Sequence, residues 1–131
     1  MKKRIIGLLL LCLFTLSSTA FAATWVYAMR DDRTYHCDVY IDSDKIEKND
    51  RTIIFWMLVI LDRPNGSGEK KIMIKTEATL TLPRNTRDLD LYTYDSDNRQ
   101  LNHDNSPPKW YQAPPGSLSY GAAEAALRYA K

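Results

Sequence analysis

The residues of this chain best suited to covalent chemistry are His36 and Cys37, which are adjacent. A thiolate nucleophile needs a base within hydrogen-bonding reach, and histidine is a frequent choice. The surrounding residues alternate as in a strand, where neighbouring side chains point to opposite faces, so these two groups cannot pair directly. His103 is the other histidine of the chain. We therefore expect no catalytic residues and no enzymatic activity.

Two groups of polar residues have spacings that could bind a cation. Asp95-Ser96-Asp97-Asn98 has the spacing that opens a calcium loop. However, Gln100 stands where such a loop has glycine, and the later bidentate glutamate is missing. A polar turn is the expected structure. His36 and Asp38 could offer two ligands on one strand face, but two ligands do not complete a site. We expect no metal ion and no other cofactor.

Aromatic residues offer a further possibility, because they are numerous for a domain of this size. Sheets commonly use aromatic side chains in the core or in cross-strand pairs. Tyr92 and Tyr94, however, share a strand face with Asp90, opposite Leu89 and Leu91, and tyrosine is favoured at binding surfaces. We take Asp90, Tyr92 and Tyr94 as the candidate binding surface. The aromatic residues considered are Trp25, Tyr27, Tyr40, Tyr92, Tyr94, Trp110 and Tyr111.

Strands must position these side chains, and about six segments have the required composition. The densest is Thr52 to Leu61, a nearly unbroken apolar run between turn residues. Such a run predicts a central strand covered on both faces by a helix, a loop or a second subunit. The predicted strands cover residues 24–29, 35–41, 52–61, 71–82, 89–94 and 99–101.

The last part of the chain predicts a linker followed by a helix. Four prolines between His103 and Pro115 disfavour a regular strand there, and we expect Trp110 and Tyr111 to attach this linker to the core. Ser117 is a good N-cap for an alanine-rich helix over residues 118–130. Its buried face is expected to comprise Leu118, Ala122, Ala125, Ala126 and Tyr129.

These elements predict a mainly β (α+β) fold. The sheet is expected to be an antiparallel meander of about six strands, with the single C-terminal helix packed on one face. No second domain fits in the roughly 109 residues that follow the leader described next.

Residues 1–22 have the three parts of a cleavable bacterial signal peptide. Lys2, Lys3 and Arg4 precede an apolar stretch that is shorter than the roughly 20 residues of a membrane span. Ala20-Phe21-Ala22 is a typical cleavage site. Cys12 lies inside the apolar stretch and does not indicate a lipoprotein. We expect an extracytoplasmic location, whether periplasmic, on the cell surface or secreted, with no membrane span after cleavage.

Charge and cysteine content limit the partners of the exported chain. Removal of Lys2, Lys3 and Arg4 from the 18 basic residues leaves 15 against 16 acidic ones, a net charge of −1. The two signs are interleaved, whereas nucleic-acid binding would need a basic stripe. Cys37 is the single cysteine of residues 23–131. It is expected either to be buried as a small apolar residue or to bridge to a second chain.

Several short motifs spread over residues 23–131 resemble the surface-adhesin protein E family of bacterial exported domains. They are Trp25-Val26-Tyr27, Tyr40-Ile41-Asp42, Tyr94 to Asn98, Trp110-Tyr111 and Pro115-Gly116-Ser117. The resemblance implies an antiparallel sheet with a helix across one face, and adhesion to host matrix or serum proteins, often as dimers. It implies no catalysis. One departure is that the family's adhesin can link helix to sheet by a disulfide, whereas residues 117–131 contain no cysteine.

Three functions are therefore weighed. The first is an exported, non-enzymatic domain that binds a host or extracellular protein. The second is a structural or assembly protein of the envelope that self-associates, as a homodimer for example, through the apolar strand Ile53 to Leu61. The third is a small periplasmic enzyme or metal binder, which only His36, Cys37, Asp38 and His103 favour.

Overall fold

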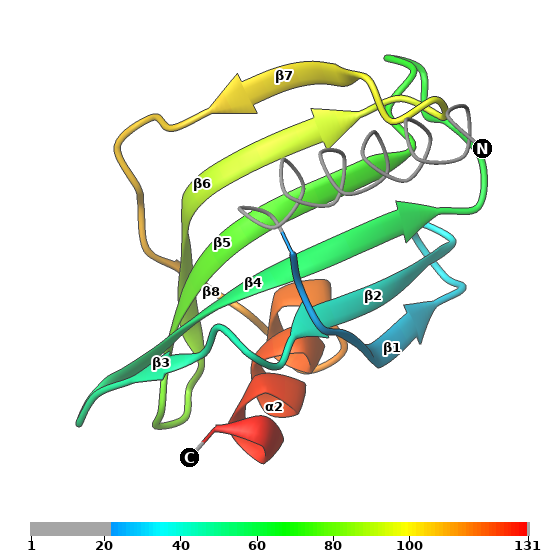
Figure 1. Cartoon of the computed structure of the whole chain (residues 1–131). Coiled ribbons are helices and arrows are strands. Elements are labelled where there is room, and N and C mark those ends of the chain that lie inside the picture. Colours follow the sequence, from blue (N-terminus) through cyan, green and yellow to red (C-terminus); the bar gives the residue numbers. More distant parts are fainter. Residues whose placement is uncertain (1–21, 131) are drawn as a thin grey trace, which may run out of the picture.

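The computed structural model describes residues 22–130 (Figure 1). The expected signal peptide therefore lies outside the described residues except for Ala22. Within the described range no helix is long and apolar enough to cross a membrane. The elements are β1 (Trp25–Asp31), β2 (Cys37–Asp42), β3 (Glu47–Lys48), β4 (Thr52–Leu61), β5 (Lys71–Thr79), β6 (Asn85–Tyr94), β7 (Gln100–Asp104), β8 (Tyr111–Gln112) and α2 (Leu118–Tyr129).

Six of the strands form an antiparallel sheet in the order β1-β2-β4-β5-β6-β7, as the meander predicted. The two-residue strands β3 and β8 pair with β4 and β6. Helix α2 packs against β1, β2 and β4 (Figure 1). The predicted architecture, a mainly β antiparallel sheet with a C-terminal helix on one face, is confirmed.

Strand β4 has the predicted bounds, and its side chains alternate between two environments. Ile53, Phe55 and Met57 are fully buried in the core beneath α2, whereas Ile54 and Trp56 on the opposite face are half-buried. Among the described elements, α2 packs broadly against the sheet. It covers only one of the two faces. The expectation that β4 is covered on both faces is therefore met only on the helix side among residues 22–130. We call the side away from α2 the open face.

The strand expected from Tyr35 begins two residues later, at Cys37. Tyr35 is 59% exposed, and His36 has a φ of 50°, which ends the preceding turn rather than continuing a strand. The carboxylate of Asp31 organises this turn by accepting the backbone N–H groups of Arg33 and Tyr35 at 3.0 and 2.8 Å. These hydrogen bonds lower the pKa of Asp31. A side chain thus satisfies backbone groups that a strand ladder would otherwise pair.

Helix α2 begins where its capping residue predicts. The hydroxyl of Ser117 accepts the backbone N–H of Tyr120 at 3.3 Å, and the buried face consists of small residues, Ala122, Ala123, Ala125 and Ala126. The expectation that Tyr129 belongs to this face is wrong, because Tyr129 is 47% exposed.

Close approach of α2 to the sheet depends on Gly121 as well as on alanine. A Cβ placed on Gly121 would lie 2.2 Å from the sulfur of Met29 in β1. Helix and sheet are held here by van der Waals contact between small residues and one flexible side chain, since no disulfide joins them.

Trp110 and Tyr111 hold the linker to the rim of the sheet rather than entering the core, since they are 45% and 44% exposed. The Tyr111 hydroxyl donates to Asp88 Oδ1 at 3.2 Å, and the Arg87 guanidinium lies over the Trp110 ring. Ala113 is buried instead, and its N–H donates to the Arg84 carbonyl at 2.8 Å. The Arg84 side chain is buried as well. It donates to the carbonyls of Thr79 and Leu80 and forms an ion pair with Glu124 of α2. A buried arginine therefore joins the linker, the β5–β6 connection and the helix.

Candidate binding face

A row of large side chains crosses the open face at the middle of the sheet. Cross-strand register places one residue from each of the six strands in this aromatic row, and paired residues on neighbouring strands share a face. Its members, from β1 to β7, are Tyr27, Tyr40, Leu58, Met73, Tyr92 and His103. The rings of Tyr27 and Tyr40 meet edge to face, with centroids 5.9 Å apart. The open face is therefore apolar and aromatic along its centre.

Two members of the predicted surface, Asp90 and Tyr92, contact His103 of β7. The rings of Tyr92 and His103 stack with centroids 4.1 Å apart and planes 4° from parallel. His103 Nε2 lies 2.6 Å from Asp90 Oδ1. Burial is the main cause that raises the pKa of Tyr92, and the nearby Asp90 carboxylate raises it further. These three side chains form one polar and aromatic cluster.

Tyr94, the third predicted residue, lies two positions after Tyr92 on the same face of β6, opposite Lys71 of β5. Burial also raises the pKa of its hydroxyl. Tyr92 and Tyr94, taken from the sequence as part of a binding surface, are both half-buried. Trp56 of β4 lies near Tyr92, at 6.2 Å between its ring centroid and that of Tyr92. The structure thus brings Asp90 and Tyr92 together and leaves Tyr94 at the edge of the cluster.

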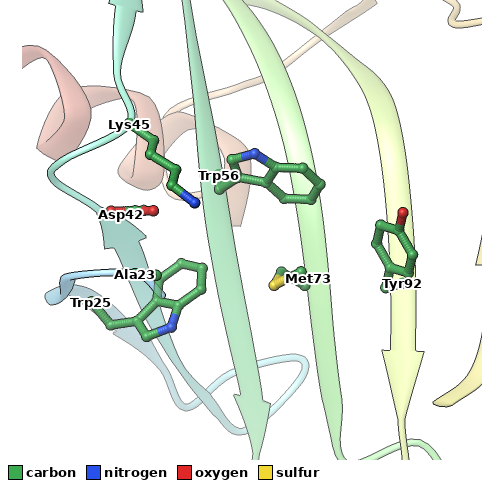
Figure 2. A pocket seen from close by; sticks show the side chains of 7 residues that line it. All are labelled: Ala23, Trp25, Asp42, Lys45, Trp56, Met73 and Tyr92. Carbon is green, nitrogen blue, oxygen red and sulfur yellow. The ribbon is translucent and has the colours of Figure 1, made fainter. Parts of the chain in front are cut away.

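A pocket of about 160 Å³ opens on the same face (Figure 2). Trp25, Trp56, Met73 and Tyr92 provide its apolar walls, and Asp42, Lys45 and Ala23 complete it. Trp25 stands opposite Asp42 in the β1–β2 ladder. This pocket was not predicted from the sequence. Trp56 follows Phe55 directly in β4 and therefore points to the opposite face of the sheet, which is a signal that could have indicated the pocket.

Asp42 is the most buried polar group of this pocket, at 1% exposure. Its Oδ1 accepts the backbone N–H groups of Thr24 and Asp44 at 3.2 and 3.1 Å. These bonds hold the N-terminal segment and the turn after β2 against the rim of the pocket. Asp42 therefore combines a nearly buried carboxylate with a place in the pocket lining.

The open face becomes polar at its far end. Glu77 of β5 accepts a hydrogen bond from the Thr52 hydroxyl at 2.8 Å and forms an ion pair with Arg87 at 2.6 Å. The Arg87 guanidinium in turn lies over the ring of Trp110, 4.7 Å from its centroid. This paired network marks the boundary of the apolar surface.

The other candidate groups are dispersed by the fold. Cys37 is fully buried, and burial raises its pKa to about 11, whereas His36 is exposed in the preceding turn. Because the Cys37 side chain is fully buried, a cysteine of a second chain cannot reach its thiol in this structure. In the turn after β6, Asp95 Oδ1 accepts the N–H groups of Asp97 and Arg99 at 2.9 Å each. In residues 22–130 no group of three or more His, Cys, Asp or Glu side chains could hold a metal ion.

Comparisons with protein-family models, curated proteins and solved structures found no match to this chain. The described residues form a small antiparallel β domain with one helix-covered face and one aromatic open face.

Proposed function

We propose that this protein is an exported, non-enzymatic domain that binds an extracellular or envelope protein through its open face. The observation that carries the proposal is the aromatic row, which crosses all six strands on the side that α2 leaves free. Tyrosine and tryptophan are enriched among the residues that dominate the binding energy of protein interfaces, since their rings bury large area at small entropic cost. The leader over residues 1–22 and the adhesin-like motifs favour a partner outside the cytoplasm.

Binding of residues 23–131 to immobilised matrix and serum proteins tests the proposal. The Tyr92→Ala/Tyr94→Ala variant removes two rings from the open face, so it should weaken saturable binding at least tenfold. Tyr35→Ala/Tyr129→Ala is the matched control, because it removes two exposed tyrosines that lie away from the open face. Equal loss in both variants, or no saturable binding to any protein of the panel, would count against this function.

A second function, self-association within the envelope, is supported by the half-buried even positions of β4. Ile54, Trp56, Leu58 and Ile60 are all apolar and face away from α2. A second copy that covers them would form a homodimer of two sheets. Sedimentation equilibrium across a wide concentration range should then give a dimer that Leu58→Lys dissociates, and a monomer at every concentration would contradict it.

A further inference from the structure

We propose that the Trp25–Trp56 pocket binds the six-membered ring of a carbohydrate, so that the group recognised on the partner is a glycan. The proposal rests on the proposed function, because Tyr92 belongs both to the pocket and to the predicted binding surface. It adds the chemical class of the ligand.

The size of the pocket fits one ring. Its volume of about 160 Å³ is close to that of a cavity of about 150 Å³ that takes up a benzene ring. A pocket of this size is too small for a folded peptide segment, and one saturated ring with its substituents directed to solvent would fill it.

The walls of the pocket fit the apolar side of a sugar. In Figure 2 the indoles of Trp25 and Trp56 and the thioether of Met73 surround one space. Sugar rings carry C–H groups on their faces, which pack against flat aromatic surfaces, while their hydroxyls point outward. Two tryptophans from different strands, β1 and β4, therefore offer two surfaces against which a ring can stack.

The polar groups of the pocket fit hydroxyls better than they fit other small ligands. Lys45 and Asp42 both line the space. Lys45 can only donate hydrogen bonds, and a carboxylate such as that of Asp42 can only accept them, whereas a hydroxyl does both. The two hydrogen bonds that Asp42 accepts from described residues are both to Oδ1, so Oδ2 is the atom assigned to a sugar hydroxyl.

Two competing ligand classes fit less well. A quaternary ammonium group would also suit aromatic walls, but it has neither a donor for Asp42 nor an acceptor for Lys45, and its charge is like that of Lys45. A purely aromatic ligand would cover Asp42 and Lys45 without offering either a hydrogen bond, which carries a desolvation cost. A polyhydroxylated ring can pack its C–H groups against the apolar walls and form hydrogen bonds with both charged groups.

The test follows the indole N–H signals of the three tryptophans by NMR during titration of the exported, processed protein. The probes are glucose, galactose, N-acetylglucosamine and N-acetylneuraminic acid, with indole and tetramethylammonium as competitors. At least one sugar should shift the Trp25 and Trp56 signals saturably. A Kd on the order of 1 mM is expected for a ligand of about twelve non-hydrogen atoms. Trp110 lies outside the pocket, so its signal should stay unchanged and Trp110→Phe should bind normally.

Variants distinguish a built site from weak stacking on any exposed indole. Lys45→Met removes a donor at an exposed turn position, and it should weaken sugar binding at least fivefold. Trp56→Ala should abolish the shift at Trp25, provided that the other amide signals show an intact fold. Unchanged binding in Lys45→Met, or stronger binding of indole or tetramethylammonium than of any sugar, would overturn the proposal.

Enzymatic deglycosylation of the immobilised partner proteins separates the two proposals. If binding persists on deglycosylated partners and no free sugar shifts Trp25 or Trp56, the carbohydrate proposal fails while the protein-binding function stands. If free sugars bind but no partner protein does, the pocket assignment stands and the proposed function fails.

Discussion

The two faces of the sheet are built from the same strands but differ in how deeply their apolar side chains are buried. On the helix side, Ile53 and Phe55 are fully buried against the alanines of α2. On the open face, Ile54 and Trp56 are half-buried although they are equally apolar. Adjacent residues of one strand thus differ because a single helix covers one face. Apolar residues of equal size are therefore buried to different depths on the two faces, and burial depends on the helix rather than on residue type.

The largest expected contrast is between Ile53→Ala and Ile54→Ala, which remove the same atoms from opposite faces of β4. Truncation of a fully buried isoleucine leaves a cavity and should lower the free energy of unfolding by about 2–5 kcal/mol. Ile54 is half-buried, so its truncation should cost about 1 kcal/mol. Urea denaturation monitored by tryptophan fluorescence measures both. Equal losses would show that the open face is as tightly packed as the core.

Arg84 provides the next test, because it joins three segments on the helix side. Arg84→Met should lower the free energy of unfolding by about 2–4 kcal/mol, since its removal leaves Glu124 without its partner and frees two backbone carbonyls. Glu124→Gln should cost less, because the Glu124 side chain is 41% exposed and water can replace the lost pairing. A double-mutant cycle by urea denaturation measures their coupling, and no coupling would contradict the contact.

The thiol of Cys37 reports on the integrity of the helix-covered face. Its pKa is raised from 9.0 to about 11 by burial, so alkylation by iodoacetamide at pH 8 should be at least 100-fold slower in the folded protein than in urea. Because the folded pKa lies above the unfolded one, the thiol's contribution to stability is complete below about pH 9. It is lost as the pH rises toward 11. Rapid labelling of the folded protein would indicate that this face opens easily.

The smallest effect is expected at the exposed edge, where Arg30 pairs with Asp62 at 2.6 Å. This ion pair lowers the pKa of Asp62, so its contribution is present at neutral pH and lost as the pH falls below the ordinary range of an aspartate. Asp62→Asn should therefore lower the melting temperature only slightly at pH 7 and not at all at pH 2–3. Thermal melts at both pH values in low salt check this. A large loss at pH 7 would mean that the edge carries more stability than exposed ion pairs usually do.

Local patterns in the sequence determined much of the fold. The bounds of β4 and the Ser117 cap of α2 both depend on residues within a few positions of one another. The alternation of Asp90, Tyr92 and Tyr94 with Leu91 and Thr93 likewise assigned these side chains to their faces correctly. Such features could be predicted because propensity, capping and two-residue periodicity act locally.

Tertiary structure alone decided which distant residues meet. His103 stacks on Tyr92 because register places β7 beside β6, and Trp25 joins Trp56 because β1, β2 and β4 are neighbours in the sheet. Tyr129 and Trp110 are 47% and 45% exposed, although the sequence pattern had placed both against the core. No local pattern encodes these contacts, because they follow from strand order and register, which minimise the free energy of the whole chain rather than of any one segment.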